Sequence, residues 1–183
     1  MSERKIRDWA WPYIRNFRTY IDIGANDGDT SVNFINDFKK VIAFEPNPTT
    51  FDILSTNKLI ESYNLALGSC NGKINLVVPF ENKPQWGSTS TLRNANWSSG
   101  ISYEVEIRTL DSFQFKEIDF IKVDVEQAEL DVILGSKETI KQNLPVIMFE
   151  NKRNEADDVI DILKEIGYTI DKHKSDTIAY IKE

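Results

Sequence analysis

Apolar residues along the chain follow two alternating patterns, and together these predict a sheet covered by helices. Short runs of β-branched and aromatic residues alternate with stretches in which apolar residues recur at helical spacing. The expected strands are residues 20–23, 41–44, 63–67, 73–80, 103–108, 119–125, 145–150, 168–170 and 177–181, and the expected helices are residues 30–38, 48–59, 128–134 and 156–166. This order predicts an α/β fold whose mainly parallel sheet has helices on both faces. The last two strands are joined by a short loop, so they must form an antiparallel hairpin.

Two segments interrupt the alternation. In residues 1–18, apolar residues recur at helical spacing from Ile6 to Phe17, although Pro12 interrupts them. We expect this N-terminal helical segment to pack against the rest of the chain, which forms a single domain over residues 19–183. Residues 81–100 are rich in Ser, Thr and Asn, and loops of this length are often functional. We expect them to form a substrate or lid loop in which Trp86 and Ser90 contact substrate; the alternative is that its tryptophans pack into the core.

The most informative motif is TYIDIGANDGDT, residues 19–30, which predicts a strand, a tight turn and the start of a helix. Gly24 and Gly28 can take backbone angles that other residues avoid, and they allow a ligand to approach the main chain closely. Glu45 ends the next predicted strand, and an acid about 20 residues past a glycine turn suits a ribose diol. The two features together predict a cofactor that contains adenosine.

The charges around this turn indicate which cofactor binds. Asn26 stands where a dinucleotide-binding motif has its second glycine, and Asp27 and Asp29 flank the start of the helix. Two carboxylates at this point repel a pyrophosphate, whereas they are compatible with the cationic S-adenosylmethionine (SAM). The alternative is that these carboxylates only cap the helix and interact with its dipole.

Composition narrows the class of protein further. The chain has 183 residues and a net charge of −7, which argues against broad affinity for nucleic acid or anionic membranes. Its single cysteine, Cys70, excludes an intrachain disulfide. The longest apolar runs are too short to span a bilayer, and the N-terminus has no apolar signal-peptide core. We therefore expect a small cytoplasmic enzyme without a membrane partner.

Six motifs in order carry a resemblance to a known family: YIDIGANDGDT, AFEPNPTTF, NLALGS, TLDSF, DFIKVDVEQAELDVILGS and PVIMFE. Over residues 19–150 the chain resembles the FkbM-type SAM-dependent methyltransferases. The resemblance implies the class I methyltransferase fold, a Rossmann-like sheet of seven strands whose last strand is antiparallel. It also implies methyl transfer to a hydroxyl oxygen, often of a sugar or another small metabolite. Gln127 departs from the family, which usually has glycine there.

The resemblance also implies a set of cofactor-binding residues. The methionine end would be surrounded by Asp22, Gly24, Ala25, Asn26 and Gly28. Glu45 would bind the ribose hydroxyls, and Asp124 would complete the site. The residues near the adenine would be Pro46, Asn64, Ala66 and Leu67.

Catalysis by such an enzyme requires a group that removes or polarises the hydroxyl proton. One predicted strand ends at Asp124 and Glu126, and the next ends at Glu150 and Asn151. Ligands of α/β sheets bind at the edge formed by the carboxyl ends of the strands. We expect Asp124 or Glu126 to act as the base, Glu150 to orient the substrate and Asn151 to contact it. The three carboxylates could instead bind Mg²⁺ or Ca²⁺, and Glu126 could simply charge the first helical turn.

Other interpretations remain open at this stage. Lys122, Asp124, Lys152 and Glu183 resemble the tetrad of RNA ribose methyltransferases, although their spacing fits poorly and the acidic charge disfavours a phosphate backbone. A non-catalytic module with a SAM fold is another alternative. His173, the only histidine, is more typical of a solvated side chain than of a base. The sequence provides no secure basis for pairing Lys122 with Asp124, and it leaves the oligomeric state open. The expected partner is a small-molecule or glycan hydroxyl acceptor.

Overall fold

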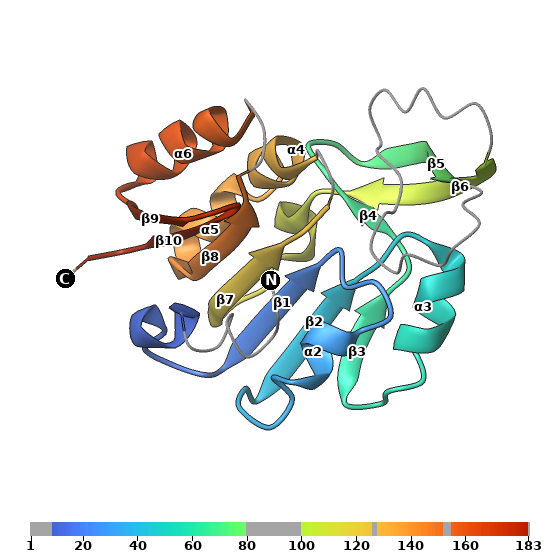
Figure 1. Cartoon of the computed structure of the whole chain (residues 1–183), viewed down its shortest axis with the longest axis horizontal. Coiled ribbons are helices and arrows are strands. Elements are labelled where there is room, and N and C mark those ends of the chain that lie inside the picture. Colours follow the sequence, from blue (N-terminus) through green and yellow to red (C-terminus); the bar gives the residue numbers. More distant parts are fainter. Residues whose placement is uncertain (1–8, 80–99, 126–127, 152–154, 183) are drawn as a thin grey trace.

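The computed structural model describes residues 9–79, 100–125, 128–151 and 155–182, and its centre is a twisted sheet of seven strands (Figure 1). The strands are β1 (Thr19–Ile23), β2 (Lys40–Phe44), β3 (Ile60–Tyr63), β7 (Ile118–Val123), β8 (Val146–Glu150), β9 (Thr169–His173) and β10 (Asp176–Tyr180). Their order is β3-β2-β1-β7-β8-β10-β9, and only β10 runs antiparallel to its neighbours. The α/β class, the mainly parallel sheet and the antiparallel terminal hairpin are therefore confirmed.

A second, three-stranded sheet was not predicted. It contains β4 (Ala66–Leu67), β5 (Gly72–Pro79) and β6 (Gly100–Arg108) in the order β4-β6-β5. The predicted strand over residues 63–67 is wrong, because β3 ends at Tyr63 and β4 pairs with the end of β6. Alternation along β6 is as expected, with Val105 and Ile107 buried and Glu104 and Glu106 exposed.

The helices differ from the expectation in length and number. They are η1 (Trp11–Tyr13), α2 (Asp29–Val32), α3 (Pro48–Leu54), η2 (Leu110–Phe113), α4 (Glu129–Leu134), α5 (Lys137–Asn143) and α6 (Glu155–Ile166). Helix α3 ends early because the hydroxyls of Ser55 and Thr56 bond back to main-chain carbonyls of its last turn. Helix α5 was not predicted, and its first main-chain amides donate to the Asp111 carboxylate at 2.7 and 3.2 Å. This cap comes from η2, because the hydroxyl of Ser136 at the N-cap position donates to the main-chain oxygen of Val132 instead of capping α5.

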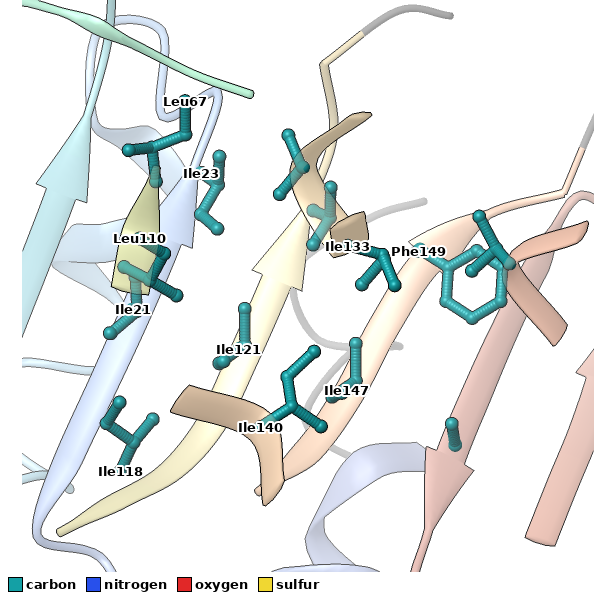
Figure 2. Packing of buried hydrophobic residues seen from close by; sticks show 14 of the residues in the cluster. Ile21, Ile23, Leu67, Leu110, Ile118, Ile121, Ile133, Ile140, Ile147 and Phe149 are labelled. Carbon is teal, nitrogen blue, oxygen red and sulfur yellow. The ribbon is translucent and has the colours of Figure 1, made fainter. Parts of the chain in front are cut away.

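Each face of the large sheet has its own hydrophobic core. Helices α4, α5 and α6 cover the face that carries Ile21, Ile23 and Ile121, and Figure 2 shows these side chains with those of the helices. The opposite face is rich in aromatic residues, where Tyr20 and Phe120 stack at a centroid distance of 5.1 Å. Alternate residues of β1 therefore enter different cores, as expected for a strand covered on both faces.

The N-terminal segment packs against the aromatic core. Ala10 and Ile14 are buried there, which confirms the packing role predicted for the apolar residues of this segment. The Trp9 indole Nε1 and the Tyr13 hydroxyl both donate to Asp171 Oδ2 at 3.0 Å, which ties the segment to β9. None of the helices in the described ranges combines the length and apolar composition needed to cross a lipid bilayer.

Candidate functional site

The carboxyl ends of β1, β2, β7 and β8 meet at one edge of the sheet, which we call the carboxyl edge. The first residues after these strands are Gly24, Glu45, Asp124 and Asn151. Open α/β sheets bind ligands at this edge. The fold therefore brings the ends of four strands, each from a different sequence motif, to one side of the molecule.

The turn after β1 is held tightly by other parts of the protein. Gly24, Asn26 and Gly28 all have positive φ angles, of 79°, 55° and 91°. A Cβ atom on Gly24 would lie 2.0 Å from the main-chain oxygen of Asp124, so β7 ends directly against the turn. A Cβ atom on Gly28 would lie 2.7 Å from Leu54 Cδ1, against α3. Contacts inside the protein thus explain why both positions are glycine. Close approach of a ligand to the main chain is not needed to explain them.

Glu45 joins this turn to the end of β2. Its side chain is buried, and its Oε2 accepts a hydrogen bond from the Asn26 main-chain amide while its Oε1 accepts one from Asn47, both at 2.8 Å. Burial raises the pKa of Glu45, and hydrogen bonds from the two amides and from the Thr50 side chain offset part of this effect. A carboxylate has about four lone-pair sites, so these three donors leave Glu45 the capacity to accept from a ribose hydroxyl. A carboxylate acceptor at this position therefore fits the ribose hydroxyls in the adenosine half of SAM.

The residues expected near the adenine fall into two groups. Asn64 lies at the end of β3, and its amide donates to the main-chain oxygen of Glu45 at 2.8 Å and to that of Pro46 at 3.3 Å. Ala66 and Leu67 are buried in the smaller sheet, and Leu67 packs beside Ile23 and Leu110 (Figure 2). Since these two side chains fill the core, any cofactor contact with them would have to involve their main chain.

A buried network of charged side chains lies beneath the turn. Asp22 is fully buried, and its Oδ2 accepts from the Ser31 hydroxyl at 2.7 Å while its Oδ1 lies 3.3 Å from Lys122 Nζ. Lys122 also reaches Asp124 Oδ2 at 3.1 Å. Burial by itself lowers the pKa of Lys122, but the two carboxylates outweigh this effect and raise it above the usual value. Lys122 is therefore a permanent cation at neutral pH.

The pairing of Lys122 with Asp124 was not predicted, although the spacing of the two residues is a signal for it. Residues two apart on a strand point to the same face, so Lys122 and Asp124 lie on one side of the sheet. Asp22 is the register partner of Lys122 on the neighbouring strand.

The catalytic candidates differ in how the structure places them. The Asp124 side chain is 49% exposed at the carboxyl edge, next to the turn. Glu150 is half-buried at the end of β8, and the main chain of Asn151 donates to Ser175 at 2.7 Å. The Asn151 amide also lies 2.8 Å from the Thr177 hydroxyl, so this side chain already binds the terminal hairpin.

Several predicted residues lie outside the described ranges: Trp86, Ser90, Glu126, Gln127, Lys152 and Glu183. Within the described ranges, no group of three or more His, Cys, Asp and Glu side chains could hold a metal ion. His173 is exposed at the end of β9, where its ring lies 5.7 Å from that of Trp9.

The sequence model of the methyltransferase FkbM domain matches residues 22–170. The chain belongs to this family. The FkbM methyltransferase of Methylobacillus flagellatus KT has a similar structure, with 18% identity and a TM-score of 0.63 over 94% of this chain. This chain spans only 46% of that protein. No curated protein sequence is significantly similar to the chain.

Two further solved structures share the fold across nearly the whole chain. Precorrin-6y C5,15-methyltransferase from Geobacter metallireducens GS-15 has 12% identity and a TM-score of 0.55, with 98% of this chain and 90% of that chain covered. An rRNA methylase from Streptococcus thermophilus has 13% identity and a TM-score of 0.53, with 97% and 95% covered. These likenesses confirm the class I methyltransferase fold that the sequence motifs implied.

Proposed function

We propose that this FkbM-family chain is a SAM-dependent methyltransferase that transfers a methyl group to a hydroxyl oxygen of a sugar, glycan or other small metabolite. The observation that carries the proposal is the position of the Glu45 carboxylate. It is buried where the turn after β1 meets the end of β2, and it accepts a hydrogen bond from the main-chain amide of Asn26. Together with membership of the family, this arrangement supports an adenosine cofactor at the carboxyl edge.

Three groups of this chain would hold the cofactor. Glu45 would accept the ribose hydroxyls, the Gly24 to Asn26 turn would lie along the methionine end, and Asp124 would accept from its ammonium group. SAM supplies an activated methyl group on a sulfonium centre. The protein's main contribution is then to align the acceptor oxygen with that methyl group and to keep water away.

The acceptor proton needs a base, because an alcohol is a weak nucleophile near neutral pH. The candidates are Asp124, whose carboxylate is half-exposed at the carboxyl edge, and Glu126, which would take the role where the cofactor ammonium occupies the oxygen of Asp124 that Lys122 leaves available. Lys122 is unsuited, because its raised pKa keeps it protonated. Glu150, at the end of the neighbouring strand β8, would orient the acceptor. A hydroxyl acceptor needs a base and some other acceptors do not. Carboxylates in these positions therefore support a hydroxyl oxygen as the acceptor.

The test is methyl transfer from radiolabelled SAM to two acceptor panels, one of hydroxylated sugars and small glycans and one of ribosomal and transfer RNA. We expect label in the first panel, and we expect Asp124→Asn to reduce kcat far more than the affinity for the acceptor. Label only in RNA would replace the acceptor class with ribose 2′-hydroxyls. No label in either panel and no binding of SAM by calorimetry would overturn the proposal.

A further inference from the structure

A continuous chain of polar contacts runs from the start of α2 to the carboxyl edge. It begins at Ser31, passes through Asp22 on β1 and Lys122 on β7, and ends at Asp124. The first three side chains are buried, with exposed fractions of 0% for Asp22 and 8% for Lys122, whereas Asp124 is half-exposed. The only member that a ligand at the edge can reach is therefore the last one.

We propose that Lys122 is a positioning residue that fixes the orientation of the Asp124 carboxylate toward the ligand. This inference rests on the proposed function, in which Asp124 accepts from the ammonium group of the cofactor. Lys122 binds Oδ2 of Asp124 at 3.1 Å, and no described residue binds Oδ1. One carboxylate oxygen is thus anchored from below while the other is available at the edge.

Lys122 can hold this position because Asp22 holds Lys122. The two residues face each other in the register of β1 and β7, and the second oxygen of Asp22 is bound by Ser31 at 2.7 Å. An ammonium on a flexible four-carbon stem is otherwise poorly oriented. Two carboxylates lie within 3.3 Å of Nζ, and one of them is fully buried, so together they restrict its position.

Stability alone is a poor explanation for this arrangement. Burying an ammonium and a carboxylate carries a desolvation cost that their attraction offsets only in part, and apolar side chains of similar volume are often at least as stabilising. The neighbouring residues on the same strand face, Phe120 on β7 and Met148 on β8, are apolar and buried. A lysine among them is better explained by what it does to Asp124 than by packing.

The test is a double-mutant cycle on S-adenosylhomocysteine affinity, measured by titration calorimetry. Lys122→Met alone would leave the Asp22 carboxylate buried without its counter-ion, so every variant carries Asp22→Asn, whose side-chain oxygen can still accept from Lys122 Nζ where the lysine is kept. The four proteins are Asp22→Asn and the same background with Lys122→Met, with Asp124→Ala, and with both changes. Cooperative thermal unfolding of each variant shows that it is folded; if the Met variant is not, Lys122→Leu takes its place.

We expect Lys122→Met and Asp124→Ala each to weaken binding about tenfold, and the combination to be no weaker than Asp124→Ala alone. Such coupling would not arise if Lys122 only stabilised the fold. Equal weakening by Lys122→Met with and without the Asp124 carboxylate, or no weakening at all, would overturn the inference and leave the proposed function standing. Folded wild-type protein that binds no S-adenosylhomocysteine would overturn both.

Discussion

Replacing Gly24 with alanine tests how closely β7 approaches the turn after β1. The new Cβ would lie 2.0 Å from the main-chain oxygen of Asp124, and the residue would keep a φ of +79°. The left-handed conformation costs a non-glycine residue about 1–2 kcal/mol. Relief of an atomic overlap in a well-packed region costs about 1–3 kcal/mol more, so we expect a total loss of about 2–5 kcal/mol.

Two other glycines separate these contributions. Gly167 also has a positive φ, of +108°, but a Cβ there meets no atom within 4 Å, so Gly167→Ala carries the backbone strain without the overlap. Gly72 has open space and no positive φ, so Gly72→Ala should change the free energy of unfolding by less than about 0.5 kcal/mol. The expected order of destabilisation is Gly24→Ala, then Gly167→Ala, then Gly72→Ala.

Urea unfolding at constant temperature measures all three variants, and unchanged m-values would show that the native state differs only in stability. For a chain of this size each kcal/mol corresponds to about 2–4 °C in melting temperature, which provides an independent reading. If Gly24→Ala were no more destabilising than Gly167→Ala, the contact between the turn and the Asp124 carbonyl would not constrain the protein. The account of the site's geometry would then be wrong.

Three further predictions concern single contacts. Asp119→Ala should cost about 2–3 kcal/mol in urea unfolding, because the buried carboxylate accepts from both the main chain and the guanidinium of Arg18. Asp171→Ala should cost about 1–3 kcal/mol and speed proteolysis of the N-terminal segment, because this carboxylate accepts from the side chains of Trp9 and Tyr13. The exposed Asp157→Ala is the control for both variants and should cost under about 0.5 kcal/mol. Burial raises the pKa of Glu45 in the folded protein above its value in the unfolded chain. Folding stability should therefore fall as the pH rises from the pKa of the unfolded chain through the pKa of the folded protein. Since the ionised form would accept the ribose hydroxyls, affinity for S-adenosylhomocysteine should fall as the pH drops through the same pKa, and a flat calorimetric profile in this range would contradict the assignment.

Local sequence patterns predicted the elements whose causes are local. The alternation of residues 103–108, the glycine turn at Gly24 and the proline at the start of α3 each act within a few residues, and the structure contains all three. Helix α5 was missed because its cap, Asp111, is far away in the sequence. The split of residues 63–67 between two sheets was missed because partner strands, rather than the segment itself, decide where each part pairs.

The candidate site shows the same division. The sequence placed Glu45 and Asp124 at strand ends, and the structure brings both to the carboxyl edge. It did not predict that Asp22 would be fully buried, because burial depends on how α2 and β7 cover it. Nor did it predict that Lys122 would bind Asp22, since that contact needs the register of β1 against β7. Motifs therefore identified the edge, and the tertiary register distinguishes the exposed carboxylate from its buried supports.

The most direct test of the central claim is thermal unfolding with saturating S-adenosylhomocysteine, with NAD⁺ and with no ligand, for wild type and Glu45→Ala. A ligand at one hundred times its dissociation constant stabilises the folded state by about 2.7 kcal/mol, which at about 2–4 °C per kcal/mol is a shift of about 5–10 °C. We predict this shift in wild type with S-adenosylhomocysteine only, and its loss in Glu45→Ala measured against that variant's own unliganded midpoint. An equal shift with NAD⁺, or none with S-adenosylhomocysteine, would contradict the account.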